Sequence, residues 1–163
     1  MRRLILAFVA LGVVSCTSTA VPERSQLNPP VIGDTAGCSA AYWREPTHFG
    51  SWEEYEPSQL VSSVFSNAGQ YEDSTLAEAL DLGDAPAGWA RDSLMREAVT
   101  GLLNAAHDSL EYPYRRYDPG IGERPGLVPH TNELLARGSP AEIQTFLTGL
   151  TSANGLDCPL DQE

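Results

Sequence analysis

The sequence predicts a mainly α-helical fold: a small single-domain helical bundle closed by one end-to-end disulfide. Apolar residues recur at helical spacing in several segments, and no segment alternates apolar and polar residues as a half-buried strand would. Two cysteines stand at the two ends of the region that has this pattern. With 163 residues, the chain has room for one ordinary domain. Irregular loops, one rich in aromatic residues and one in proline and glycine, complete this prediction.

The first two predicted helices lie in the N-terminal half of the domain. Residues 58–69 present one apolar face, made of Leu60, Val61, Val64 and Phe65. A short second helix is predicted over 75–80. Its start has Thr75 and Glu78 at the spacing of a capping box, in which each side chain satisfies the other residue's backbone N–H.

The longest predicted helix runs from about residue 87 to residue 110. Its wide apolar stripe consists of Leu94, Met95, Ala98, Val99, Leu102, Leu103, Ala106 and Leu110. The last helix is predicted over 139–154, because Ser139-Pro140-Ala141-Glu142 supplies an N-cap, a proline at the first helical position and a capping-box glutamate. Gly155 ends it, and a shorter helix is expected over 131–137.

Two segments lack helical periodicity. The first, 42–57, mixes acidic residues with five aromatic ones, which are Tyr42, Trp43, Phe49, Trp52 and Tyr55. The second, 112–129, contains four prolines and three glycines. Its irregularity predicts a loop that lies outside the core.

The N-terminal residues follow the same sequence of features as a bacterial lipoprotein signal. Two arginines precede an apolar run over 4–14, which is too short to span a bilayer but fits the central part of a signal peptide. Val13-Val14-Ser15-Cys16 then resembles a lipobox, with valine where leucine is commoner. The resemblance implies that 1–15 are removed and that Cys16 is lipidated. The alternative is an ordinary secretory signal, cut for example after Ala20.

We therefore expect an exported chain that is attached to the membrane through its lipid. Its expected parts are a signal peptide (1–15), a lipidated flexible tether (16–36), a disulfide-closed helical domain (37–160) and a short tail (161–163). Proline, serine and threonine in the tether favour an extended linker. Thr17 is not the aspartate that signals retention at the inner membrane, so the expected location is the cell envelope, at the outer membrane in a bacterium with two membranes.

The charge excludes one large class of partner. The chain has 22 acidic and 10 basic residues, a formal net charge of −12, and removal of Arg2 and Arg3 with the signal changes −12 to −14. Such a chain repels phosphate backbones, so nucleic acid is not an expected partner. All the basic residues are arginines, which argues against a Schiff-base lysine or a P-loop.

Two cysteines remain after Cys16, and they admit only one pairing. Cys38 and Cys158 are separated by 120 positions, and an exported protein folds in an oxidising compartment. We therefore expect a disulfide between them. The alternative, a catalytic thiol, would need a neighbouring base, and neither cysteine lies in such a motif.

Several short motifs together resemble a helical module of bacterial secreted and surface proteins. That module begins Gly-Cys-x-x-Gly-Tyr-Trp-Lys, carries Leu-Asn-Ala-Ala-His in its long helix and ends near Gly-x-x-Cys-Pro-Leu. The matching segments here are Gly37-Cys38, Tyr42-Trp43-Arg44, Leu103-Asn104-Ala105-Ala106-His107 and Gly155-Leu156-Asp157-Cys158-Pro159-Leu160. Ala41 and Arg44 depart from the pattern, and 120–129 looks inserted. The resemblance implies the fold and the disulfide, but no activity.

The long predicted helix carries the polar residues that are candidates for catalysis or metal binding. Asn104, His107 and Glu111 are spaced i, i+3 and i+7, so His107 and Glu111 would be one turn apart. Such a pair can transfer protons or share a metal. The alternative, which we favour, is that Asn104 and His107 hydrogen-bond nearby backbone, because no further histidine or cysteine stands at metal-ligand spacing. We expect no metal and no cofactor.

The aromatic and acidic segment also has two interpretations. Tyr42, Trp43, Trp52 and Tyr55 can form a stacking platform for cell-wall sugars, with nearby glutamates accepting hydroxyl hydrogen bonds. Alternatively, Tyr42 and Trp43 pack in the core near Cys38, and the glutamates are solvated.

Three functional hypotheses follow. The first, which we favour, is a cell-envelope lipoprotein that acts as a non-catalytic interaction or structural module. The second is a carbohydrate-binding or cell-wall-binding module that uses segment 42–57. The third is a small hydrolase that uses His107 with Glu111 or Asp108. The expected partners are the membrane, through the lipid, and an envelope protein or cell-wall glycan.

Overall fold

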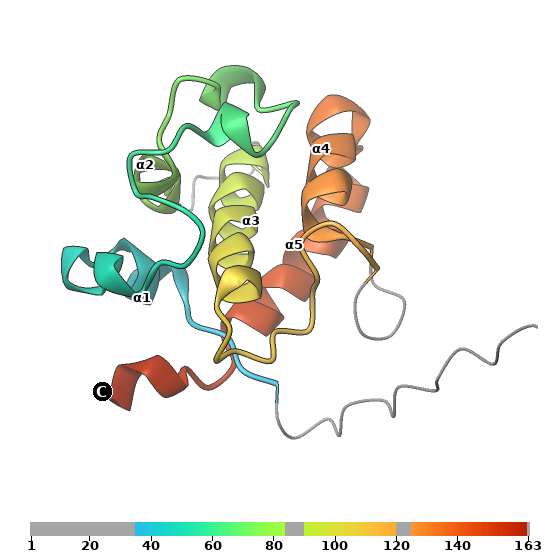
Figure 1. Cartoon of the computed structure of the whole chain (residues 1–163). Helices are drawn as coiled ribbons and strands as arrows, with labels where there is room; N and C mark the ends of the chain where they lie inside the picture. Colours follow the sequence, from blue (N-terminus) through green and yellow to red (C-terminus); the bar gives the residue numbers. More distant parts are fainter. Residues whose placement is uncertain (1–34, 84–89, 120–124, 163) are drawn as a thin grey trace, which may run out of the picture.

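The computed structural model describes residues 35–83, 90–119 and 125–162 (Figure 1). These residues are mainly helical, and no strand occurs among them apart from one isolated antiparallel bridge between Leu60 and Thr75. The mainly α-helical prediction is therefore confirmed. The expected signal peptide and nearly all of the expected tether lie outside the described residues. Within those residues, no helix has the length and apolar character needed to cross a membrane.

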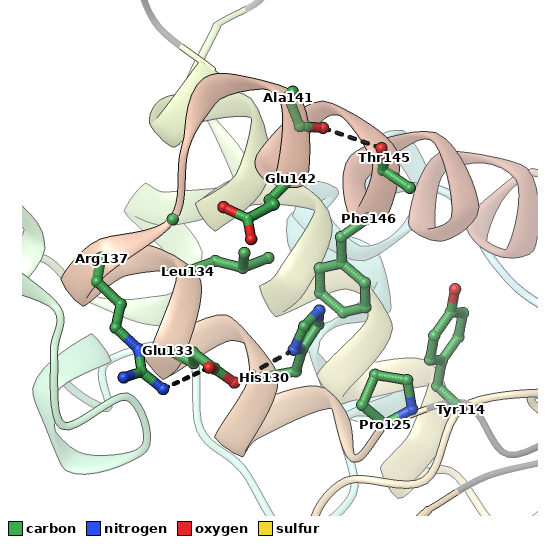
Figure 2. Close-up of a pocket in the computed structure, with 11 residues that line it drawn as sticks. Tyr114, Pro125, His130, Glu133, Leu134, Arg137, Ala141, Glu142, Thr145 and Phe146 are labelled. Atoms are coloured by element: carbon green, nitrogen blue, oxygen red, sulfur yellow. Dashed lines mark hydrogen bonds and ion pairs between the residues drawn. The ribbon is translucent and has the colours of Figure 1, made fainter.

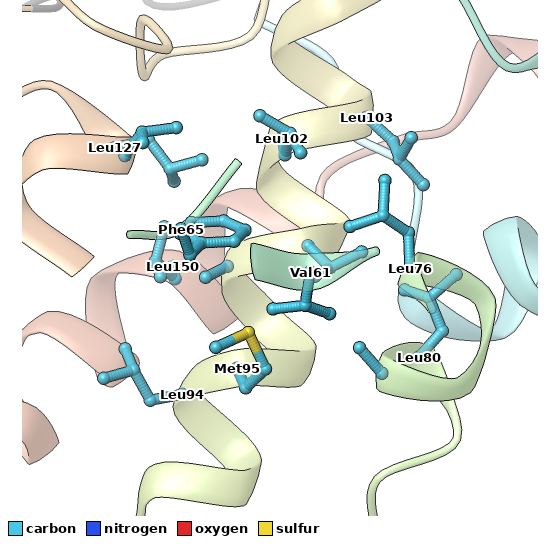
Figure 3. Packing of buried hydrophobic residues seen from close by; sticks show 14 of the residues in the cluster. Val61, Phe65, Leu76, Leu80, Leu94, Met95, Leu102, Leu103, Leu127 and Leu150 are labelled. Atoms are coloured by element: carbon cyan, nitrogen blue, oxygen red, sulfur yellow. The ribbon is translucent and has the colours of Figure 1, made fainter. Parts of the chain in front are cut away.

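Helix α3 lies at the centre of the domain, and the other helices pack around it (Figure 1). Helices α4 and α5 cover one side of α3, and α1 and α2 cover the other. The helices are α1 (Ala40–Arg44), α2 (Leu76–Leu80), α3 (Ala90–Ala106), α4 (Leu127–Arg137) and α5 (Pro140–Asn154). Figure 3 shows the core between them, where fully buried side chains include Leu76, Leu80, Leu94, Met95, Leu102, Leu127 and Leu150.

Both capping boxes predicted from the sequence are present. The Thr75 side chain accepts the backbone N–H of Glu78 at the start of α2, and Glu78 accepts the N–H of Thr75 in return. Ser139 and Glu142 make the same pair at α5, where Pro140 occupies the first turn. Such boxes form through local contacts, which is why spacing alone locates them.

The predicted helix over 58–69 is wrong. Only two short 3₁₀ helices form there, η2 (Val61–Ser63) and η3 (Gly69–Tyr71). The backbone of this segment instead hydrogen-bonds the segment that leads into α2. The Val61 N–H donates to the carbonyl of Ser74, and the Leu76 N–H donates to the carbonyl of Gln59. The predicted apolar face is used only in part, since Val61 and Phe65 are fully buried while Leu60 is exposed.

Two helix boundaries also differ from the prediction. Helix α3 ends at Ala106 rather than near Leu110, because the chain turns and Leu110 N–H donates to the carbonyl of His107. The predicted start of this helix at 87 lies outside the described residues. Helix α4 begins at Leu127 rather than at residue 131, and the N–H groups of Leu127 and Val128 donate to carbonyls of the preceding loop.

The loop over 112–129 was predicted to lie outside the core, and this is wrong for part of it. Tyr112, Tyr114, Leu127 and Val128 are buried. The Arg116 guanidinium binds the Glu54 carboxylate, which fixes the loop to the aromatic segment. Irregular backbone therefore contributes to the core here, because its side chains fill the space beside α5.

The two ends of the domain are joined, as expected. Cys38 and Cys158 form the predicted disulfide, and Gly37 N–H donates to the carbonyl of Asp157 at 3.3 Å. The chain continues into a last 3₁₀ helix, η5 (Pro159–Gln162), which includes part of the expected tail. The domain is thus closed by a covalent bond and a backbone hydrogen bond at one end of α5.

This closure requires a glycine at position 37. A Cβ on Gly37 would lie 2.3 Å from the carbonyl oxygen of Ala153, which is a backbone atom and cannot rotate away as the end of a side chain could. We expect Gly37→Ala to lower the free energy of unfolding by about 1–3 kcal/mol in urea denaturation. Gly50→Ala is the matched control, because nothing lies within 4 Å of its Cβ position. Equal effects of the two substitutions would contradict this prediction.

Candidate functional site

Asn104 is a structural residue at the centre of the domain. It is fully buried, and its Oδ1 accepts the backbone N–H of Cys38 at 2.8 Å and the indole N–H of Trp43 at 2.9 Å. Its Nδ2 donates to the carbonyl of Cys38 at 2.9 Å and to Asn154 Oδ1 at 3.1 Å. Both the oxygen and the nitrogen of the side-chain amide are therefore hydrogen-bonded within the protein. Asn104 is therefore not available to a ligand.

A chain of buried polar groups continues from Asn104 across the α3–α5 interface. Tyr112 donates its hydroxyl to Asn154 Oδ1, and Asn154 Nδ2 donates to the Glu97 carboxylate at 2.8 Å. The Arg96 guanidinium then binds Glu97 at 3.0 Å. Each of these groups has a partner, so the network fixes the register of the two helices without forming a reactive centre.

The four aromatic residues that were candidates for ligand binding are buried in the core rather than exposed. Tyr42, Trp43, Trp52 and Tyr55 are between 0% and 9% exposed. The Trp52 indole N–H donates to the backbone carbonyl of Trp43, which ties the two tryptophans together. The interpretation of these rings as an open sugar-stacking platform is therefore wrong, because their faces are used by the core.

His107 and Glu111 do not form the proton-transfer or metal-binding pair that helical spacing would allow, the interpretation that the sequence disfavours. Helix α3 ends at Ala106, so the two residues are not one helical turn apart, and Glu111 is exposed. His107 instead faces the aromatic segment, where its Nε2 lies 3.6 Å from Glu53 Oε1. Its Nδ1 accepts the backbone N–H of Ser109 at 3.2 Å.

This geometry determines which ring nitrogen of His107 carries the proton when the ring is neutral. A backbone N–H can only donate, so Nδ1 supplies the lone pair and the neutral ring carries its proton on Nε2. The nitrogen that faces Glu53 is thus a donor, with no lone pair for a general base or a metal. Within the described segments, moreover, no group of three or more His, Cys, Asp or Glu side chains could hold a metal ion.

A candidate binding surface is the groove between α4 and α5, with a volume of about 740 Å³ (Figure 2). Only Gly138 and Ser139 separate the two helices, so the end of α4 lies next to the start of α5. The floor of the groove is apolar and aromatic, and it consists of Tyr114, Pro125, Leu134 and Phe146. This volume lies within the range of protein pockets that bind ligands.

His130 forms one wall of this groove. Figure 2 shows its ring beside Phe146, and the ring centroids are 4.5 Å apart with the planes at 89°. Tyr114 meets the same phenyl ring edge-on at 5.8 Å. Phe146 is held between two aromatic neighbours, so the floor has a fixed shape before any partner binds.

The rim of the groove is charged. Arg137 donates to Glu133 at 2.6 Å, so its positive charge is paired, while His130 lies 3.8 Å from the second oxygen of Glu133. Glu142 adds a further carboxylate. The Ser139 hydroxyl and backbone N–H hold the pKa of Glu142 below its usual range, and the charges of Arg137 and His130 act in the same direction.

Sequence patterns did not reveal this groove. His130, Glu133 and Arg137 belong to no motif, and Tyr114 and Pro125 come from a loop that was expected to lie outside the core. The only available signal was the Gly138-Ser139 connection, which places two amphipathic helices in direct succession. The groove arises from how these helices pack, which spacing along the chain does not specify.

The pKa of Glu142 leads to a prediction about pH. Because its folded-state pKa is lowered, the capping box stabilises the fold above the unfolded-state pKa, and this contribution is lost as the pH falls through the lowered value. We expect NMR titration to find Glu142 ionised to a lower pH than a glutamate without a partner. Ser139→Ala should move its pKa back up. An unchanged titration in that variant would contradict the assigned cause.

No protein family, curated protein or solved structure matches this chain. The resemblance to a bacterial surface module therefore stays a prediction. Functional inference rests on the groove and on the other contacts described above.

Proposed function

We propose that this protein is a lipid-anchored module of the bacterial cell envelope that binds another envelope protein without catalysing a reaction. The observation that carries the proposal is the groove between α4 and α5, which has a fixed aromatic floor and a charged rim. Two candidate site residues support it, because the candidate binding residue Asn104 is used by the core and the Nε2 of His107, the weak catalytic candidate, is a donor.

The position of the groove suits an anchored binder. The chain enters the domain at Gly37, which is bonded to Asp157 just beyond the C-terminal end of α5. The groove residues Ala141, Glu142 and Thr145 lie in the N-terminal half of the same helix. A helix of 15 residues is about 22 Å long. An anchor at Cys16 would therefore leave the groove at the far end of α5 from the attachment point.

The chemistry of the groove favours a cationic amphipathic segment as the partner. Its floor accepts an apolar side chain, and Glu142 stays ionised on the rim while Arg137 is already paired with Glu133. The formal charge of −12 on the whole chain also attracts basic partners over longer distances. The proposed occupant is a helical segment of an envelope protein that places a leucine or phenylalanine between lysines or arginines.

The groove can be tested with two labelled amphipathic peptides, one of leucine and lysine and one of leucine and glutamate. We expect fluorescence anisotropy to detect binding of the lysine peptide alone. Ala141→Trp should fill the groove and weaken binding by about tenfold or more. Gln144→Trp is the control, since Gln144 is exposed on the same helix and does not line the groove. Equal binding by both variants would show that the peptide is held by overall charge and would refute the groove.

The anchor needs a separate experiment. In a bacterial host, the wild-type chain should incorporate labelled palmitate and partition with membranes. Cys16→Ala should abolish both properties, while Thr17→Ala should preserve them. If the Cys16→Ala chain stays with the membrane and the wild-type chain takes up no label, the lipoprotein assignment is wrong.

A further inference from the structure

A second cavity, of about 360 Å³, lies at the other end of the domain, where the end of α3 meets the aromatic segment and the chain that follows Cys158. Its polar wall consists of Ser51, Glu53, His107 and Ser109. Pro159 and Leu160 supply its apolar lining. No residue of this cavity lines the groove between α4 and α5, so the two sites can be tested independently.

The cavity presents a hydrogen-bond donor beside an acceptor. The Nε2–H of His107 faces Glu53 Oε1, and the 3.6 Å between them is too long for a direct hydrogen bond. The other glutamate oxygen, Oε2, accepts the backbone N–H of Asp108 at 2.7 Å and fixes the carboxylate. A third group placed between them can therefore bridge Oε1 of Glu53 and Nε2–H of His107.

A hydroxyl group fits this pair. It can accept a hydrogen bond from Nε2–H and donate one to Oε1 at the same time, whereas an ammonium group only donates and a fully ionised phosphate only accepts. Ser51 and Ser109 add two more hydroxyls to the same wall. A metal ion is disfavoured, because Nε2 has no lone pair while Nδ1 accepts from Ser109. Phosphate is repelled by Glu53, and no arginine lines the cavity.

We propose that this cavity binds one sugar residue of a glycan. Vicinal hydroxyls of the sugar bridge His107 and Glu53 and reach the two serines, while the C–H face of the ring lies on Pro159 and Leu160. This places carbohydrate recognition beside the buried aromatic residues rather than on their faces.

The walls of the cavity are held in place before binding. Pro159 follows Cys158, whose disulfide to Cys38 fixes the apolar lining. The Trp43 ring lies 6.0 Å from that of His107 and supports the polar wall from behind. A site with fixed walls loses little conformational entropy on binding, which suits a weak and polar ligand such as a sugar.

The test uses the full chain labelled with ¹⁵N and titrated with triacetylchitotriose or cellotriose, with inorganic phosphate in a parallel series. We expect one of the saccharides to shift the backbone amides of Ser109 and Leu160, and phosphate to leave them unchanged. Glu53→Gln keeps the shape but turns the acceptor side into an amide that also donates, and it should weaken binding at least about tenfold. Glu56→Gln is the matched control, because Glu56 is exposed and lies outside the cavity.

Two further variants separate this site from its neighbours. Ser51→Leu places a larger apolar side chain in the cavity and leaves the His107 and Glu53 side chains unchanged in chemistry, and it should abolish the saccharide-induced shifts. Ala141→Trp, which blocks the groove, should leave them unchanged. Binding that survives Ser51→Leu, shifts caused by phosphate, or no shift with either saccharide at tens of millimolar would each overturn the proposal.

Discussion

Loss of the Cys38–Cys158 disulfide is expected to lower the free energy of unfolding by about 5 kcal/mol. The bond closes a loop of 120 positions, and a crosslink of that length removes much of the conformational freedom of the unfolded chain. Domains of this size are stabilised by only about 5–15 kcal/mol in total. A variant with both cysteines replaced by alanine should therefore unfold at a much lower urea concentration.

Both the protein that keeps Cys38 and Cys158 and the double alanine variant should carry Cys16→Ala, so that they differ only in these two cysteines. Urea denaturation with and without dithiothreitol should give a large difference for the protein that keeps Cys38 and Cys158, and none for the double alanine variant. Alkylation and mass spectrometry of the non-reduced protein check the bond directly. Two alkylated thiols, or an unchanged urea midpoint after reduction, would contradict this prediction.

Asn104→Ala is expected to cost about 3–5 kcal/mol, the second large effect. The substitution leaves the backbone N–H of Cys38 and the indole N–H of Trp43 buried without an acceptor, and each such group costs about 1–3 kcal/mol. It also removes both donors of the amide. The near-ultraviolet circular dichroism of Trp43 should weaken in the same variant, because its indole N–H loses the acceptor Asn104 Oδ1.

Asn67→Ala is the control for this experiment. Asn67 also makes hydrogen bonds, to Asn132, but it is exposed, so water replaces the lost partner and we expect a change within about 1 kcal/mol. Asn104 and the disulfide act on the same residue, Cys38, so their effects should not add. Equal costs for the two asparagine substitutions would show that Asn104 does not organise the core.

The parts of the fold that depend on local contacts were predicted from the sequence. Both capping boxes join residues three positions apart, and two cysteines allow only one pairing. The predicted helix over 58–69 is wrong because its apolar spacing also suits turns whose backbone groups find partners elsewhere, at Ser74 and Leu76. Spacing predicts the burial of Val61 and Phe65 but not the exposure of Leu60, and it does not report where the backbone groups find partners.

The candidate sites were harder to predict, because they form between segments that are distant in sequence. His107 was singled out, but its partner Glu53 lies 54 positions earlier in the chain. The same holds for the groove, whose floor combines Tyr114 from a loop with Phe146 from α5. An aromatic-rich segment indicates neither a surface nor a core, and here Trp43 and Trp52 belong to the core.

The closure at Cys38 has a mechanical consequence. A force applied to the chain at residue 36, as by a membrane anchor pulling against a bound partner, meets the disulfide within two residues. The load then passes into Cys158 and, through the hydrogen bonds of Asn104, into the C-terminal end of the central helix. The N-terminal segment cannot be detached from the domain residue by residue. The fold therefore resists extension until the disulfide breaks or the whole core unfolds.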